Sequence, residues 1–257
     1  GEVFSGTNKH NGIKVAIKRL NKAALLKYGN YLLAAFWREI DCMKKCECEN
    51  SIKLFQNFET QNNFNIIMEL CDGDLLNHLV RHKGGLSTEE VKYTFLQLNN
   101  AFRLMHQNKI VHRDLKLSNI LVKYTDSNRN NFIPKLSDYG FSKELNHNAT
   151  ETHLGTPATM APEVMMNLHY GAQYALWSIG IMMYHLHFNE LPYNGFNEQQ
   201  ILKLIQSKKP IKQPNDPLMR NLINRLLVYN PKDRISWDEY LNHHFFNGDN
   251  NNNVQKA

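Results

Sequence analysis

The segment His112-Arg113-Asp114-Leu115-Lys116-Leu117-Ser118-Asn119 decides the fold of this chain. It places an aspartate, a lysine and an asparagine within eight residues, directly after a long amphipathic segment. A second acidic triplet, Asp138-Tyr139-Gly140, follows farther along the chain. Either triplet alone would suit an ordinary solvated loop, so the signal lies in the order and spacing of the whole set.

This set resembles the catalytic loop of eukaryotic protein kinases, H-R-D-L-x-x-x-N, followed by a variant of their D-F-G. Lys116 is similar to the lysine of the serine/threonine branch. The resemblance implies that Asp114 accepts the proton of a substrate hydroxyl and that Lys116 neutralises the transferring phosphoryl group. It also implies that Asn119 and Asp138 hold Mg²⁺. Phosphoryl transfer needs this positioning and charge neutralisation, and hard oxygen donors suit magnesium.

The 257 residues, 42% of them hydrophobic, suffice for two lobes or one large domain with a substantial core. The sequence has no run of eighteen apolar residues, so no membrane span is predicted. The start has no secretory signal pattern and no initiator Met, so we expect a fragment of a longer protein. Four cysteines, at 42, 46, 48 and 71, form no paired framework, which favours a reduced, cytoplasmic setting.

The net charge of +6 could indicate a nucleic-acid or anionic partner. The basic residues are scattered, however, so a solvated basic surface is favoured and no nucleic-acid partner is expected. Cys42, Cys46 and Cys48 lack the matching quartet that a structural zinc site needs. The asparagine-rich end, residues 247–257, is predicted to be disordered.

Near the start, Gly1 and Val3 match the last part of the kinase glycine-rich loop, G-x-G-x-x-G-x-V. Residues 14–18 read as a strand whose period of two puts Ala16 and Lys18 on one face. They resemble the kinase V-A-I-K. The resemblance implies that Gly1 approaches the phosphates, that Val3 and Ala16 cover adenine, and that Lys18 binds the α- and β-phosphates. An edge strand with exposed lysines is the alternative.

A helix is predicted over residues 31–47, with Leu32, Phe36, Ile40 and Met43 as its apolar stripe. Glu39 lies on the same flank, and the resemblance implies that it pairs with Lys18. Strands are predicted over 52–58 and 64–70. After them the resemblance implies five nucleotide contacts: Met68 beside adenine, the backbone of Glu69 and Cys71 at its edge, Asp74 at the ribose, and Leu121 beneath the base.

The remainder is predicted to be mainly helical. Ser87 and Glu90 form a capping box that opens a long buried helix. Short strands are predicted over 120–124 and 132–137, and helices near 197–207, 217–228 and 236–243.

The segment that ends in Met160-Ala161-Pro162-Glu163 resembles an activation loop. The resemblance implies that Thr152 is a phosphorylation site for an upstream kinase, with Arg113 pairing with the phosphate; an unmodified hydroxyl is equally open. Thr156 is expected to contact Asp114 and Lys116.

Three further features concern the rest of this pattern. Arg234 is expected to pair with Glu163. Tyr139 replaces the phenylalanine of D-F-G, and its phenol needs a hydrogen-bond partner or water. Ala175 stands before Leu176-Trp177-Ser178-Ile179-Gly180, where the family has an aspartate that holds the catalytic loop's backbone. Losing that acceptor costs about 1–3 kcal/mol if buried donors stay unpaired.

We therefore predict an α+β, two-lobed protein-kinase-like fold, with a small, mostly β lobe (1–70), a larger, mostly α lobe (71–246) and the tail. The predicted function is ATP- and Mg²⁺-dependent transfer of the γ-phosphate to serine or threonine of a protein substrate. The alternative is a pseudokinase that binds or scaffolds, which Ala175 and Tyr139 favour and the intact Lys18, Glu39 and Asp114 oppose. The calcium/calmodulin-dependent and Unc-51-like groups are both similar. Ser118, where relatives that prefer basic substrates often have glutamate, argues mildly against a strong arginine preference.

Overall fold

The structure is a computed structural model that describes residues 2–27, 30–144, 155–168 and 171–247. Gly1, Thr152 and residues 248–257 lie outside the described residues. Contacts divide the chain into unit 1 (Gly1–His78, Asn100–His112 and Leu117–Glu144) and unit 2 (Leu79–Asn99, Arg113–Lys116 and Leu145–Ala257). Each unit combines several separate chain segments, so the predicted lobe boundary at residue 70 stays a prediction. The predicted disorder of the tail also stays a prediction.

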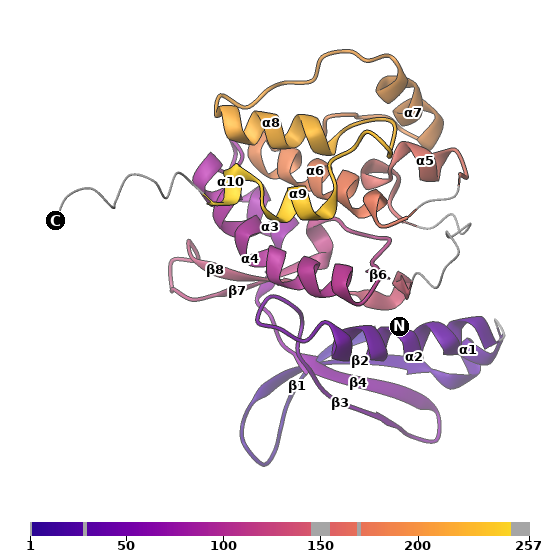
Figure 1. Cartoon of the computed structure of the whole chain (residues 1–257). Coiled ribbons are helices and arrows are strands. Elements are labelled where there is room, and N and C mark those ends of the chain that lie inside the picture. Colours follow the sequence, from indigo (N-terminus) through magenta and orange to yellow (C-terminus); the bar gives the residue numbers. More distant parts are fainter. Residues whose placement is uncertain (1, 28–29, 145–154, 169–170, 248–257) are drawn as a thin grey trace. The chain divides into compact units, whose positions relative to one another are not determined.

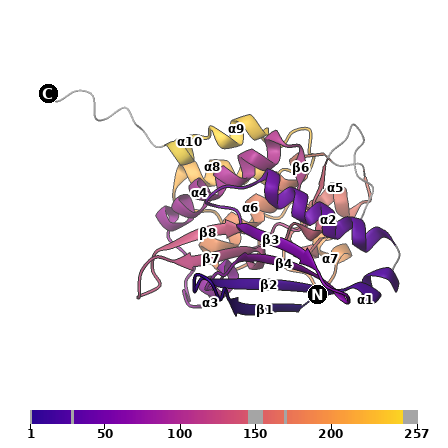
Figure 2. The ribbon, with the colours of Figure 1, turned by 90° about the horizontal axis from the view of Figure 1, so that it is seen from below.

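An antiparallel sheet of four strands opens unit 1, in the order β1-β2-β4-β3 (Figure 2). Its strands are β1 (Glu2–Thr7), β2 (Lys14–Asn21), β3 (Leu54–Glu59) and β4 (Asn63–Glu69). Val3 pairs with Lys18 across β1 and β2, and Ala16 pairs with Met68 across β2 and β4. Because neighbours on one face of a sheet lie close together, this register gathers the predicted nucleotide-binding side chains.

The helix α2 (Asn30–Lys45) follows a short helix, α1 (Lys22–Lys27), and contacts β3. Phe36, Ile40 and Met43 are buried as the periodicity predicts, whereas Trp37 is exposed. The side chain of Leu32 lies outside what the structure describes. Glu39 falls on the inward flank of the helix and is itself buried.

Short strands and turns complete unit 1. The strands β5 (Gly73–Asp74), β7 (Ile120–Tyr124) and β8 (Phe132–Leu136) form an antiparallel sheet, and β6 (Ile110–Val111) pairs with β9 (Lys143–Glu144). Two 3₁₀ turns, η1 (Leu117–Asn119) and η2 (Tyr139–Phe141), flank the β7–β8 hairpin. The predicted strands at 120–124 and 132–137 are therefore present.

Helices dominate unit 2 (Figure 1). The long helix α4 (Thr88–Gln107) passes from unit 2 into unit 1 at Asn100. It begins at the predicted capping box: the amide of Glu90 donates to the Ser87 hydroxyl, and the amide of Ser87 donates to the Glu90 carboxylate. The helices predicted near 197–207, 217–228 and 236–243 are α7 (Glu198–Gln206), α8 (Pro217–Leu226) and α9 (Trp237–Leu241). The remaining elements of unit 2 are η3 (Pro157–Thr159), α5 (Pro162–Met165), α6 (Gln173–Phe188) and α10 (His244–Asn247). The short helix α3 (Leu75–Val80) begins in unit 1 and ends in unit 2.

The core of unit 2 forms around α6, which is buried over most of its surface. Its sequence is apolar on nearly all sides, as a helix enclosed by other elements must be. Contacts to α8 and η3 cover it. Antiparallel sheets in one unit and helices in the other confirm the predicted α+β class.

Two further observations concern the described residues as a whole. Among their helices, none combines the length and apolar character that a bilayer crossing requires. Within the same residues, no group of three or more His, Cys, Asp or Glu side chains is placed to hold a metal ion. The four cysteines are free thiols.

Candidate active site

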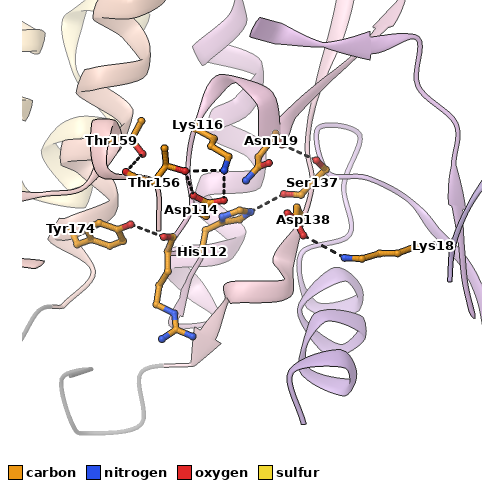
Figure 3. Close-up of polar contacts among 11 residues, drawn as sticks. Lys18, His112, Asp114, Lys116, Asn119, Ser137, Asp138, Thr156, Thr159 and Tyr174 are labelled. Atoms are coloured by element: carbon orange, nitrogen blue, oxygen red, sulfur yellow. Dashed lines mark hydrogen bonds and ion pairs between the residues drawn. The ribbon is translucent and has the colours of Figure 1, made fainter. Parts of the chain in front are cut away.

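Lys18 of β2 lies between two carboxylates of unit 1, of which Figure 3 shows that of Asp138. Its Nζ is 2.6 Å from Glu39 Oε1, on α2, and 3.4 Å from Asp138 Oδ1, which follows β8. The predicted pairing of Lys18 with Glu39 is therefore present. Two carboxylates drawn from distant segments fix the ammonium at one place on the sheet.

Burial and charge act in opposite directions on this pair. Burial disfavours the charged ammonium, but the charges of Glu39 and Asp138 outweigh it, so the pKa of Lys18 is raised. Burial also raises the pKa of Glu39, and Lys18 offsets only part of that effect. Lys18 therefore keeps its positive charge throughout the physiological range.

A cavity of about 450 Å³ opens beside Lys18 within unit 1. Its volume is in the range of small-molecule sites, and apolar walls with a few polar groups are typical of them. The cavity lining includes the described residues for which a nucleotide or metal contact was predicted: Val3, Ala16, Lys18, Met68, Glu69, Cys71, Asp74, Asn119, Leu121 and Asp138. Glu39, the predicted partner of Lys18, lines it as well. The structure thus brings these residues together, while their binding roles stay predictions.

Asn119 and Asp138 are held by a network that the sequence did not reveal. The Ser137 hydroxyl donates to the carbonyl oxygen of Asn119 over 2.8 Å, and the Ser137 amide donates to the same oxygen over 2.9 Å. His112 Nε2 donates to the Ser137 carbonyl over 2.8 Å. Asp138 itself has a φ of 58°, a left-handed conformation that aspartate tolerates better than most residues. These contacts fix the backbone at Asn119 and at Ser137, the residue that precedes Asp138.

Glu69 is a second residue whose surroundings the sequence did not reveal. Its carboxylate is 2.7 Å from Lys123 Nζ and 3.0 Å from Lys135 Nζ. Burial alone would raise the pKa of Glu69, but the two lysines outweigh burial and lower it. The side chain is therefore a structural anion, and any adenine contact at this residue is left to its backbone, as predicted.

Asp114 and Lys116 of unit 2 form a closed set with Thr156 (Figure 3). The Thr156 hydroxyl donates to Asp114 Oδ1 over 2.7 Å, and Lys116 Nζ donates to the Thr156 oxygen over 2.8 Å. Lys116 Nζ also lies 2.7 Å from Asp114 Oδ2. The predicted contacts of Thr156 are confirmed, and Asp114 is shown to accept a hydrogen bond from an aliphatic hydroxyl.

Tyr139 has a hydrogen-bond partner, as its burial requires. Its hydroxyl shares a 2.8 Å hydrogen bond with the Ser51 hydroxyl, and the ring is fully buried. Burial raises the pKa of the Tyr139 phenol well above its ordinary value. The departure from phenylalanine thus adds a polar link across the interior of unit 1 and leaves the ring packed.

The residues near the cavity suit Mg²⁺ in their chemistry. Asn119 and Asp138 both line the cavity and carry the hard oxygen donors that magnesium prefers. Magnesium commonly takes one or two such protein ligands together with substrate phosphates. Asn119 and Asp138 would hold the ion, and the ion would neutralise phosphate charge.

Comparisons with known proteins agree with this geometry. A family model for the protein kinase domain matches residues 1–246. Serine/threonine-protein kinase 33 of Mus musculus is 32% identical over 260 residues, which cover 96% of this chain and 52% of that protein.

Two further relatives are serine/threonine kinases by name. Serine/threonine-protein kinase ULK1 of Homo sapiens is 33% identical over 253 residues, covering 95% of this chain and 24% of that protein. Serine/threonine-protein kinase unc-51 of Caenorhabditis elegans is 33% identical over 246 residues, covering 91% of this chain and 28% of that protein. The chain spans about half or less of the length of these relatives.

These matches bear out the resemblance that the motifs carry. The residues matched by the family model include Gly1 and Val3, the Lys18–Glu39 pair and the catalytic-loop pattern. Two of the relatives fit the Unc-51-like similarity expected from the sequence. The chain belongs to the protein kinase domain family.

Proposed function

We propose that this protein is an ATP- and Mg²⁺-dependent kinase that phosphorylates serine or threonine hydroxyls of other proteins. One observation carries the proposal: the Asp114 carboxylate already accepts a hydrogen bond from a threonine hydroxyl, with the Lys116 ammonium beside both. A substrate hydroxyl needs the same two partners.

The chemistry that we propose is an in-line displacement. The substrate hydroxyl oxygen attacks the γ-phosphorus of ATP as the bond between that phosphorus and the β–γ bridging oxygen breaks. ADP leaves with the bonding electrons, and Asp114 takes the proton of the hydroxyl. Lys116 offsets the charge on the transferring group, and Lys18 that on the α- and β-phosphates. Positioning and charge neutralisation account for most of the catalysis in such reactions.

The nucleotide would bind in the cavity of unit 1. Val3, Ala16 and Leu121 supply apolar surface for adenine, and Asp74 supplies a carboxylate for the ribose. Bound Mg²⁺ supplies charge neutralisation at the phosphates. We also propose an upstream kinase acting on Thr152, no nucleic-acid partner, and a cytoplasmic location, which the free thiols support.

Transfer of radiolabelled γ-phosphate from Mg-ATP to a generic protein substrate tests the proposal in the protein expressed at full length. We expect Asp114→Asn to lower transfer by at least about 100-fold, because the proton acceptor is lost. Asp238→Asn makes the same change at an exposed position of α9 and should leave transfer unchanged.

Binding must be measured beside turnover to separate the two readings of this fold. Asp114→Asn should keep the affinity for ATP, whereas Lys18→Met should lose it. Equal phosphate transfer by the wild type and Asp114→Asn would reject the assignment. Nucleotide binding without transfer by the wild type would instead favour a binding module. The names of the relatives favour the kinase over that module.

A further inference from the structure

The residue before Asp114 has an unusual backbone. Arg113 has a φ of 66°, in the left-handed region that costs a residue with a side chain about 1 kcal/mol or more. It is also buried, with 2% of its surface exposed. A strained residue persists only where its surroundings hold it, so neighbouring groups must fix the peptide that leads into Asp114.

One such group is the phenol of Tyr174. Its hydroxyl donates to the Arg113 carbonyl oxygen over 2.8 Å, and both residues are buried (Figure 3). Tyr174 lies in the first turn of α6, the central helix of unit 2. The hydrogen bond therefore ties the catalytic-loop backbone to the most enclosed helix of that unit.

The start of α6 is itself fixed by side chains from farther along the chain. Arg234 Nη1 donates to the carbonyl of Gln173 over 2.8 Å, and Trp237 Nε1 donates to the carbonyl of Ala172 over 3.1 Å. Tyr174 follows these two carbonyls directly. Its phenol is thus presented from a rigid support, as a positioning group must be.

Gly155 also lies close to the Arg113 carbonyl oxygen. It has a φ of 128°, and a Cβ atom added there would lie 2.7 Å from the Arg113 oxygen and 3.4 Å from the Tyr174 hydroxyl oxygen. Only glycine permits this approach. Thr156 follows Gly155 and donates a hydrogen bond to the Asp114 carboxylate. The Arg113 carbonyl therefore lies beside two chain segments: the one that carries Asp114 and the one that carries Thr156.

We propose that Tyr174 is a positioning residue for Asp114 that holds the catalytic-loop backbone through the Arg113 carbonyl. Ala175 is buried in α6 and cannot accept or donate a side-chain hydrogen bond. Tyr174, one residue earlier, reaches the same stretch of backbone with a donor. This role rests on the proposed kinase function, since it concerns the geometry of that reaction.

Tyr174→Phe removes the hydroxyl and keeps the ring. Tyr240→Phe is the matched control: Tyr240 is also a buried tyrosine of unit 2, and its hydroxyl donates over 2.8 Å to Asn99 Oδ1. In the full-length protein, we expect Tyr174→Phe to lower kcat by about 10-fold or more with an unchanged KM for ATP. Tyr240→Phe should shift the urea midpoint similarly but keep kcat.

Amide hydrogen exchange gives a readout that does not depend on turnover. Exchange in peptides covering residues 112–117 and 155–157 should quicken in Tyr174→Phe and remain at the wild-type rate in Tyr240→Phe. Gly155→Ala should produce the same local change, because its Cβ would displace the Arg113 carbonyl.

The outcomes separate this inference from the proposed function. If kcat and local exchange are unchanged in Tyr174→Phe, or if Tyr240→Phe alters both equally, the positioning role is wrong. If Asp114→Asn transfers phosphate as well as the wild type does, the kinase assignment fails, and the exchange data still decide whether Tyr174 holds this backbone.

Discussion

Arg234 and Glu163 form a buried, two-pronged ion pair, with Nη1 2.8 Å from Oε1 and Nη2 2.9 Å from Oε2. The pairing was predicted from the sequence, and the side chains are only 0% and 3% exposed. Such a pair is costly to break from one side, because the remaining charge stays buried without its partner.

We therefore expect Arg234→Met to lower the free energy of unfolding by about 3–5 kcal/mol. Arg225→Met is the matched control, since Arg225 pairs with Glu239 at the surface, where the two side chains are 40% and 52% exposed. It should cost less than about 1 kcal/mol. Urea denaturation of both variants measures the difference. Equal losses of unfolding free energy would contradict the conclusion that burial makes the Arg234–Glu163 pair costlier to break.

The hydroxyl of Thr156 leads to a second prediction. Thr156→Val removes the donor to Asp114 and the acceptor for Lys116 while keeping the shape of the side chain. Hydrogen bonds to charged groups contribute about 1.5–3 kcal/mol, so kcat should fall by roughly 10-fold or more. Thr156→Ser retains the hydroxyl and should retain most activity. If Thr156→Ser lowers kcat as much as Thr156→Val does, the hydroxyl is not responsible for the loss.

Tyr139 and Ser51 invite a double-mutant cycle. Either Tyr139→Phe or Ser51→Ala breaks this buried hydrogen bond, which should cost about 1–3 kcal/mol. The double variant removes both hydroxyls, so it should be less destabilised than the sum of the single variants, with a coupling of about 0.5 kcal/mol or more. Urea midpoints provide the four free energies. Additive effects would mean that the 2.8 Å contact contributes no coupling.

Cys71, in the cavity wall, should be a slow nucleophile. Burial, with a contribution from Glu69, raises its pKa from 9.0 to about 12. At pH 8 its thiolate population is then roughly 1,000-fold smaller than that of an ordinary thiol. We expect iodoacetamide to label Cys71 far more slowly in the folded protein than in urea, as measured by peptide mass spectrometry. Rapid labelling of the folded protein at pH 8 would refute this.

The same shift predicts how stability depends on pH. Because the pKa values of Cys46 and Cys71 are both raised to about 12, the folded protein retains these protons where the unfolded chain, with values near 9.0, releases them. Their contribution to stability is complete below about pH 9 and is lost as the pH rises towards 12. Cys46→Ala and Cys71→Ala should each reduce the slope of the unfolding free energy against pH in that interval.

Sequence reasoning found contacts that motifs encode. The resemblance to the kinase family identified three sets of partners that lie far apart in the chain, because the family pattern fixes both members. They are Lys18 with Glu39, Arg234 with Glu163, and Thr156 with Asp114. Helices and strands with clear periodicity were also predicted, with ends that differ from the structure by a few residues. Local hydrophobic patterns determine such elements but fix their ends weakly.

Contacts made by residues outside the motifs could not be predicted. The phenol of Tyr174 reaches a backbone carbonyl, and a carbonyl has no identity in the sequence. Ser137 holds the backbone of Asn119 in the same way. The need of Tyr139 for a partner followed from its chemistry, but Ser51 could be named only once the two segments were placed together. The short helices α1 and α3 have too few residues to show periodicity.

The shared position of Lys18 has a consequence for ligand selection. One ammonium faces two carboxylates, so this cluster carries one surplus negative charge when all three groups are ionised. An uncomplexed triphosphate would add more charge of the same sign at short range, where repulsion in a partly buried site is strong. We therefore expect the cavity to bind a polyphosphate whose charge a divalent cation has already reduced more tightly than the uncomplexed anion.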